Sequence, residues 1–383
     1  MNGFEVRRPT VLIYKKRILR WAETFIAQQA RTLTRYVPAF AGLEPDDGGA
    51  AMIAGIPRVL LADHHPWPRL GRALMELTHR VPRRWRRAIA AQDPQLVHAH
   101  FGSQAHNGHA IAAALGIPLV VTYHGADASE TPRSAAGVAH RRRAFRYADH
   151  NIAVSEFLAG CLRSAGCPAD RITVHYIGVD TTRFAPGADP RDPATVLFVG
   201  RLVRLKGVHH LLHAMVAVHR AVPGVSLLIA GDGPLRQTLE AEARQLRIPA
   251  RFLGVQDQDA VRALMRRATV LVGPSIHDDA GHSEGLPVTF LEAQACGLPV
   301  VVSRSGGTAE GVNDGESGLL FAPGDEGALT SHLLRVLQDA ALRERMGRAA
   351  RALMERRFDL VTQTGRLEAI YDRVRETAQA RPA

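Results

Sequence analysis

Two glutamates that are eight positions apart have the chemistry to bind hydroxyl groups. Glu284 lies in a polar loop, SIHDDAGHSEGLP, and Glu292 lies in the segment after it, which has a helical pattern. Pro287 suits the first turn of that helix and Gly297 suits its end. Glu284 could accept two sugar hydroxyls, and Glu292 could hold a ribose diol. Helix capping by Glu284 and a buried or surface position for Glu292 are the alternatives that the spacing leaves open.

Two cations beside the start of another helix could bind a diphosphate. Arg201 and Lys206 follow an apolar run, TVLFVG, that ends at Gly200. The chain has 45 arginines and only three lysines, so a lysine at position 206 indicates that a compact positive charge is favoured there. Two solvated surface cations are the alternative. The helix that starts after Glu284 would add a positive terminus at Gly285, Leu286, Pro287 and Val288, through the free backbone N–H groups that all of these except the proline have.

Three other positions follow apolar runs in the same way. His124 ends LVVTYH in the first half, and a histidine there is either structural or part of a site. Gly233 lies in the turn GDGP and could pack against a nucleotide. Val255 ends RFLGV, where backbone groups could bind a base edge. Plain strand-to-helix turns explain the last two equally well.

The elements that must position these residues alternate along the chain. Continuous Val/Leu/Ile runs are typical of parallel strands that are covered on both faces, and helical patterns such as 209–221 and 235–246 lie between them. We therefore predict an α/β protein with two doubly wound sheets, with ligands bound beyond the carboxyl ends of the strands. The predicted strands are 10–14, 96–101, 119–124, 150–155, 172–177, 195–200, 226–231, 251–254, 269–275, 298–303 and 318–322.

Length and composition limit the function classes. A chain of 383 residues is too long for one core, so two domains are expected, and the proline-rich stretch 184–195 is the predicted linker. Residues 1–190 hold 24 Arg and Lys against 15 Asp and Glu, which favours anionic partners. Three cysteines without metal-site spacing indicate reduced thiols in the cytosol. We expect no signal peptide and no membrane span.

Five blocks of the second half together resemble the donor-binding domain of retaining glycosyltransferase family 4. They are FVGRLVRLKGV, LLIAGDGP, RFLGV, the block around Glu284 and Glu292, and DGESGLLFAPGD. The resemblance implies a GT-B fold with two Rossmann-like domains facing across a cleft. It implies that Glu284 contacts the donor sugar, that Glu292 contacts the nucleotide ribose, and that Arg201 and Lys206 bind the diphosphate.

The first half resembles the same family at other residues. The pattern T-x-H-G-x-D at His124 resembles a signature in which the histidine lies near the donor sugar. AETFI (22–26) and HAHFG (98–102) are similar to the subgroup that builds exopolysaccharides of the colanic acid and amylovoran type. Trp21, Glu23 and Thr24 stand where many members have a glycine-rich loop, and Thr24 is our candidate for a donor phosphate contact.

Two further patterns have rival interpretations. His-x-His at 98–100 begins the metal site of many hydrolases, but the second half offers no later ligands of that kind. The basic segment 68–90, which has Trp85 among the arginines of Arg83–Arg87, suits either an anionic membrane surface or solvent. No nucleic-acid motif is present.

The sequence thus predicts a glycosyltransferase of the EC 2.4 class that acts with retention. The predicted parts are an acceptor domain at 1–185, a donor domain at 192–358 and a helix at 359–377 that crosses back to the first domain. A nucleotide diphosphate sugar would be the co-substrate, a glycan or lipid-linked oligosaccharide the acceptor, and no metal or other cofactor is expected. A cytoplasmic location, with peripheral contact to the inner membrane, fits this interpretation. The alternatives are a non-catalytic nucleotide-sugar-binding protein and a sugar-nucleotide epimerase.

Overall fold

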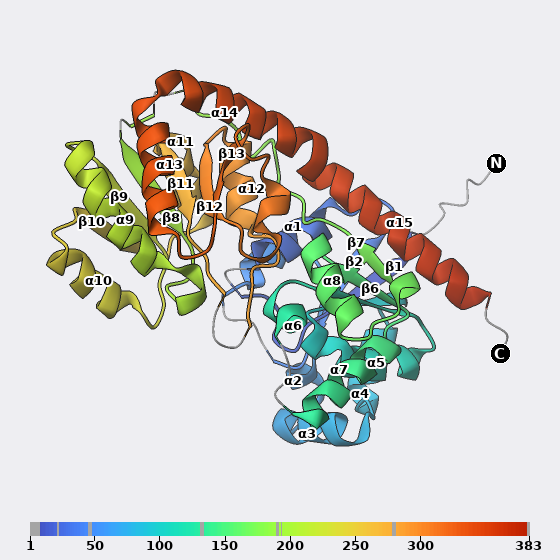
Figure 1. Cartoon of the computed structure of the whole chain (residues 1–383). Helices are drawn as coiled ribbons and strands as arrows, with labels where there is room; N and C mark the ends of the chain where they lie inside the picture. Colours follow the sequence, from blue (N-terminus) through green and yellow to red (C-terminus); the bar gives the residue numbers. More distant parts are fainter. Residues whose placement is uncertain are drawn as a thin grey trace, which may run out of the picture. The chain divides into compact units, whose positions relative to one another are not determined.

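The computed structural model describes residues 8–20, 23–44, 48–130, 134–188, 191–192, 194–277 and 281–380 (Figure 1). The chain forms two compact units. One unit comprises the described residues of 1–128, 132–178 and 360–383, and the other comprises those of 129–131 and 179–359. Residues 179–188 thus group with the second unit.

The first unit is built on a seven-stranded parallel sheet of order β3-β2-β1-β4-β5-β6-β7. The order reverses between β1 and β4, because the chain adds β2 and β3 on one side and β5 to β7 on the other. Buried side chains lie on both faces of the sheet, because Val11 and Ile13 of β1 point to one face and Leu12 and Tyr14 point to the other. The strands are β1 Thr10–Tyr14, β2 Val37–Gly42, β3 Arg58–Leu60, β4 Pro94–His100, β5 Leu119–Tyr123, β6 His150–Ala153 and β7 Ile172–Val174.

Helices cover this sheet between successive strands. Ser134 and Ser155 begin α7 and α8, where each hydroxyl accepts a backbone N–H three residues on. The helices of this unit include α1 Thr24–Thr32, α2 Leu61–His64, α3 Pro68–Thr78, α4 Arg83–Ala90, α5 Ala105–Leu115, α7 Ala135–Tyr147, α8 Glu156–Ser164 and α15 Leu360–Gln379; the short α6 spans Ala126–Ser129.

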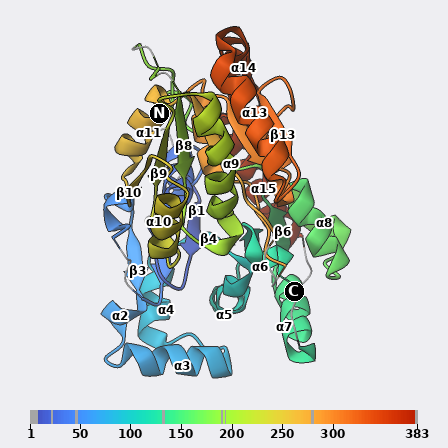
Figure 2. The same ribbon diagram turned by 60° about the vertical axis from the view of Figure 1, so that its left-hand side comes forward.

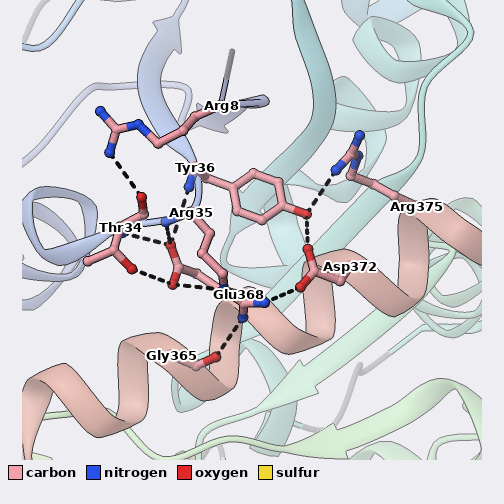
Figure 3. A network of polar contacts seen from close by, with 8 residues as sticks. All are labelled: Arg8, Thr34, Arg35, Tyr36, Gly365, Glu368, Asp372 and Arg375. Atoms are coloured by element: carbon pink, nitrogen blue, oxygen red, sulfur yellow. Dashed lines mark hydrogen bonds and ion pairs between the residues drawn. The ribbon is translucent and has the colours of Figure 1, made fainter. Parts of the chain in front are cut away.

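The last helix, α15, is fastened to the first unit by a polar network (Figure 3). The carboxylate of Glu368, which is 1% exposed, accepts the backbone N–H groups of Thr34 and Arg35 at 2.8 and 2.6 Å. Asp372 accepts the Tyr36 hydroxyl at 2.7 Å. Because several donors compensate the buried carboxylate, α15 stabilises the first unit, although the rest of that unit is distant from it in sequence.

The second unit is built on a six-stranded parallel sheet of order β10-β9-β8-β11-β12-β13, which reverses between β8 and β11. Both faces are covered, since α9 and α13 pack together while α12 contacts α11 and α14. The strands are β8 Thr195–Val199, β9 Ser226–Ala230, β10 Ala250–Gly254, β11 Val270–Gly273, β12 Val300–Ser303 and β13 Gly318–Phe321. The helices are α9 Val208–Ala221, α10 Arg236–Gln245, α11 Gln258–Arg267, α12 Val288–Ala295, α13 Glu326–Gln338 and α14 Ala340–Leu353.

These elements confirm the predicted doubly wound architecture. Each of the eleven predicted strands is present, with ends that differ by a few residues. Strands β2 and β3 were not predicted, because VPAFAG contains proline and glycine and RVL is only three residues long. The segment 68–90 is two helices, α3 and α4, because Val81 and Pro82 interrupt the helical pattern.

Candidate functional site

The predicted diphosphate site lies at the point where the strand order of the second sheet reverses. Lys206 follows β8, and Ser275 and Glu284 follow β11, the neighbouring strand. In parallel sheets, a reversal of strand order separates the adjoining loops and leaves room for a ligand beyond the carboxyl ends of the strands. The three residues therefore lie where this fold class binds ligands.

Lys206, Glu284 and Ser275 form a hydrogen-bonded cluster. Glu284 Oε1 lies 2.6 Å from Lys206 Nζ and accepts the Ser275 hydroxyl at 2.7 Å. The two charged side chains are 18% and 10% exposed. A shielded pair is held firmly, and the ammonium has two further N–H bonds to offer an anion. Sequence analysis missed Ser275, because the contact joins two loops and has no local pattern.

Two glycines let the backbone come close around this cluster. Gly207 has φ +60°, and a Cβ there would lie 2.0 Å from the Pro274 carbonyl oxygen. Gly306 has φ +62°, and a Cβ there would lie 2.1 Å from the Glu284 carbonyl oxygen. Any side chain at either position would push apart the loops that hold Lys206 and Glu284. Gly306 was not among the predicted site residues, although its place after β12 could have drawn attention to it.

Glu292 lies apart from this cluster, on the second turn of α12. It is 5% exposed, and Gln258 donates to its Oε1 at 3.4 Å. Burial raises the pKa of Glu292 to about 8, an effect that the Gln258 hydrogen bond and the charge of Arg183 only partly oppose. At neutral pH the group is therefore largely a carboxylic acid, which can both donate to and accept from a pair of hydroxyls.

The helix starts beside the reversal point have no side-chain caps. Pro287 is the N-cap residue of α12, and Gly207 that of α9, and no side chain accepts their first amides. By contrast, aspartates cap α11, α13 and α14 in the same unit. Pro287 thus precedes the helix and does not lie in its first turn. Gly285 and Leu286 are buried, and Val288 is half-buried.

The remaining predicted residues of this unit lie at the same edge of the sheet. Arg201 is exposed, and no described residue pairs with its guanidinium. A Cβ on Gly200 would lie 3.8 Å from Lys206 Cε, so the two are neighbours, and one on Gly233 would clash with the Leu202 oxygen at 2.5 Å. The Val255 side chain is 68% exposed. Among the described residues, Glu284 is hydrogen-bonded to Lys206 and Ser275 and to none of these four.

In the first unit, His124 is half-buried at the end of β5, beside the buried His100. His124 Nε2 is 3.0 Å from His100 Nδ1, and burial lowers the pKa of both rings well below the ordinary value. His124 Nδ1 has no hydrogen-bond partner among the described residues. Asp127 accepts the backbone N–H groups of Gly102, His124 and Gly125, which fixes the loop that bears the histidine. His124 is therefore a neutral, rigidly held ring.

A cavity of about 450 Å³ lies at the reversal point of the first sheet. Its walls include Lys15 and Lys16 after β1, and Phe101 after β4. Lys15 pairs with Glu23, and burial lowers the pKa of its ammonium. The lining also contains Arg17, Arg20, Glu44, Arg72 and Gln104, and it does not contain Thr24, which is the first residue of α1. Trp21, which was noted beside Thr24, lies outside the described residues.

The His-x-His pattern has a structural explanation. Both ring nitrogens of His98 are engaged, one with the Tyr371 hydroxyl at 2.6 Å and the other with Thr122 Oγ1 at 2.7 Å. Within the described ranges, no group of three or more His, Cys, Asp or Glu side chains could hold a metal ion.

The sequence left open whether the segment around Trp85 faces a membrane or solvent, and the structure shows that the Trp85 ring faces neither. Its ring is fully buried, and its Nε1 donates to the Val59 oxygen at 3.2 Å. The ring packs inside the unit because α4 turns its apolar side to the sheet, and Arg83, Arg84, Arg86 and Arg87 stay exposed. None of the described helices is long and apolar enough to span a membrane.

Comparison with known proteins identifies the family. Residues 22–183 match the family described as Glycosyltransferase Family 4, and residues 180–353 match the one described as Glycosyl transferases group 1. A GDP-mannose-dependent phosphatidylinositol monomannoside mannosyltransferase of Mycolicibacterium smegmatis is 32% identical over 99% of both chains. A glycogen synthase of Mycobacterium tuberculosis is 33% identical over 81% of this chain and 74% of its own.

Two further similarities concern the subgroup and the fold. A protein of Escherichia coli named for colanic acid biosynthesis is 32% identical over 56% of this chain and 54% of its own. The structure of Anabaena HepE in complex with UDP and glucose is similar with a TM-score of 0.78, at 20% identity, over 94% of this chain and 99% of that one. The resemblance seen in the sequence is thereby confirmed. The chain belongs to glycosyltransferase family 4, a retaining family, and is a nucleotide-sugar-dependent glycosyltransferase with the GT-B fold.

Proposed function

We propose that the chain transfers a sugar, with retention, to a glycan or lipid-linked acceptor in the biosynthesis of an exopolysaccharide or another cell-surface polysaccharide. The observation that supports the donor site most strongly is the Lys206–Glu284–Ser275 cluster at the reversal point of the second sheet. Donor binding belongs to residues 192–358 and acceptor binding to residues 1–185. The exopolysaccharide assignment rests on the AETFI and HAHFG patterns and on the similarity to the colanic acid protein.

The diphosphate of the donor binds to Lys206 and Arg201. When the bond to the sugar breaks, negative charge develops on the leaving oxygen, and these two cations and the uncapped start of α12 stabilise it. Fixed groups of this kind are each worth about 3 kcal/mol of barrier. Arg201 is exposed and without a partner among the described residues, so it is available to the ligand.

The two glutamates bind different parts of the donor. Glu284, held by Lys206 and Ser275, accepts hydroxyl groups of the sugar. Glu292, protonated because burial raises its pKa to about 8, holds the ribose diol with one donor and one acceptor. Gly200, Gly233 and Val255 line the nucleotide through their backbone, and Gly285, Leu286, Pro287 and Val288 lie beside the phosphates.

When the transfer takes place in one step, retention requires that the acceptor attack from the side on which the diphosphate leaves. The leaving phosphate oxygen takes the acceptor proton on that face, so the C–O bond forms as the sugar–phosphate bond breaks. His124 of the first unit contacts the donor sugar as a neutral hydrogen-bonding group, since burial lowers its pKa. Thr24 contributes a phosphate contact. No metal is required for these steps.

The exposed surface of α4 bears on the class of acceptor. The three relatives differ in the activity that their names state, so they do not select an acceptor. A lipid-linked acceptor is favoured here because Arg83, Arg84, Arg86 and Arg87 are all exposed on α4, where they can contact an anionic membrane.

A transfer assay tests this function. The protein is first screened by thermal shift against UDP-, GDP- and ADP-sugars, and the stabilising donor is then labelled in its sugar and incubated with a lipid-linked acceptor. We expect a glycosylated product whose anomeric configuration matches the donor. Donor binding without product would indicate a binding protein, and an altered donor sugar without an acceptor would indicate an epimerase. Either result would overturn the proposal.

A further inference from the structure

Helix α3 presents an apolar face to solvent. Trp67, Leu70, Leu74 and Leu77 are 68%, 59%, 47% and 81% exposed. The described chain has seven exposed large apolar side chains, and four of them fall within residues 67–77. Single exposed leucines need no explanation, but such a concentration indicates a contact surface.

Leu70, Leu74 and Leu77 lie on one side of the helix, because their spacing of four and three residues follows one stripe of a 3.6-residue repeat. Trp67 is the residue directly before the helix, at the amino end of this stripe. The helix packs against the rest of its unit through Gly71 and Met75, which are both buried. Thus α3 is fastened to its unit by one stripe and exposes a second one beside it. In Figures 1 and 2, α3 lies at the lower end of the first unit, beyond α4.

The surroundings of this stripe are strongly basic. Residues 67–90 contain seven arginines and one acidic residue, Glu76, which is itself paired with Lys16 and Arg72. Six of these arginines are exposed: Arg69, Arg80, Arg83, Arg84, Arg86 and Arg87. A partner protein with an apolar groove would not by itself need this charge, whereas an anionic lipid surface matches both features.

We propose that α3 is an interfacial membrane helix, which inserts Trp67, Leu70, Leu74 and Leu77 among the acyl chains of an anionic membrane while the arginines of α3 and α4 contact the headgroups. The proposal rests on the function proposed above and makes it more specific, because it places the apolar contact on α3 instead of Trp85. Trp67 lies at the amino end of the stripe, where its ring suits the boundary between headgroups and acyl chains. Such a contact would keep the protein at the surface on which a lipid-linked acceptor is found.

Sedimentation with vesicles tests the insertion. Wild-type protein is expected to sediment with vesicles of phosphatidylglycerol and phosphatidylcholine. The triple variant Leu70→Gln/Leu74→Gln/Leu77→Gln should lose this binding by about tenfold or more, because it removes the apolar contact and keeps every charge. The control variant Val138→Gln/Val361→Gln removes two exposed apolar side chains from α7 and α15 and should sediment like wild type. All three proteins should have the same unfolding midpoint.

Fluorescence gives a second, residue-specific measurement. Anionic vesicles should shift the tryptophan emission to shorter wavelength, and Trp67→Phe should abolish the shift while most sedimentation persists. Sedimentation with anionic vesicles should be weaker, and less sensitive to salt, in the variant Arg83→Gln/Arg84→Gln/Arg86→Gln/Arg87→Gln.

Several results would overturn the proposal: no sedimentation of the wild type, equal sedimentation of the triple variant, or equal binding to pure phosphatidylcholine. A stripe that instead joins two copies would give a dimer in ultracentrifugation that the triple variant converts to monomer, without vesicle binding. Failure of sugar transfer would refute the proposed function and leave the sedimentation result untouched, so the two can be told apart.

Discussion

Replacing Lys206 with methionine separates the ion pair that its ammonium makes in the structure from the diphosphate contact that we propose for it. Nζ lies 2.6 Å from Glu284 Oε1, and the side chains are only 18% and 10% exposed. In the free protein the variant leaves Glu284 as a shielded carboxylate whose recorded partner is the Ser275 hydroxyl. An uncompensated charge of this kind is expected to lower the free energy of unfolding by about 2 kcal/mol.

The same change should act separately on turnover. If Lys206 stabilises the diphosphate as it leaves, its loss raises the barrier by about 3 kcal/mol, which lowers kcat by roughly 100-fold. The double variant Lys206→Met/Glu284→Gln removes the uncompensated charge, so its stability should return toward that of wild type while turnover stays low. The variant Arg204→Ala, a nearby exposed cation outside the proposed site, is the matched control for charge alone.

The assays are urea unfolding for stability and product formation at saturating donor for kcat. The reasoning predicts a stability loss that the second substitution reverses and an activity loss that it does not reverse. Near-normal kcat in Lys206→Met would refute the diphosphate assignment. A turnover loss that disappears in the double variant would show that the lysine acts only by pairing with Glu284.

Three other predictions concern Glu292, His124 and Glu368. Burial raises the pKa of Glu292 in the folded protein to about 8 from an ordinary value of 4.5. The stability that this group contributes is therefore complete below pH 4.5 and is lost as the pH rises toward 8. In urea unfolding, Glu292→Gln should lack this decline in the free energy of unfolding, and parallel pH profiles of variant and wild type would contradict the prediction. His124→Ala should lower kcat by about 100-fold with the fold intact, and unchanged turnover would remove the residue from the site. Glu368→Gln should lower the free energy of unfolding by about 2–3 kcal/mol because its carboxylate accepts buried backbone N–H groups. Asp372 is half-exposed, so Asp372→Asn should lower the free energy of unfolding by less than about 1 kcal/mol. Equal losses in the Glu368 and Asp372 variants would contradict the idea that burial makes the Glu368 contact the stronger one.

The sequence was sufficient for the architecture because the pattern of a doubly wound fold is local. Buried parallel strands are continuous Val/Leu/Ile runs, so β8 and β11 were recognised directly. Strands β2 and β3 were not recognised, because pairing of β2 with β1 and of β3 with β2 stabilises segments whose own residues lack a strand pattern. Lys206 and Glu284 were each expected after the carboxyl end of a strand, and the family resemblance brought them into one donor site.

Contacts between loops that are distant in the chain could not be predicted from the sequence. The hydrogen bond from Ser275 to Glu284 and the close approach of Gly306 depend on how two loops fold over the sheet edge. The orientation of an amphipathic helix was equally undetermined. Trp85 and Leu77 both lie in basic helical segments, yet the first is buried and the second is 81% exposed, because neighbouring elements decide which stripe is covered.

A crystal structure with the donor selected by thermal shift tests the central claim most directly. The account predicts that the diphosphate oxygens lie within about 3.2 Å of Lys206 Nζ, with hydroxyls of the sugar on Glu284 and those of the ribose on Glu292. A nucleotide sugar bound at another part of the chain, with both carboxyl groups directed away from it, would contradict the account.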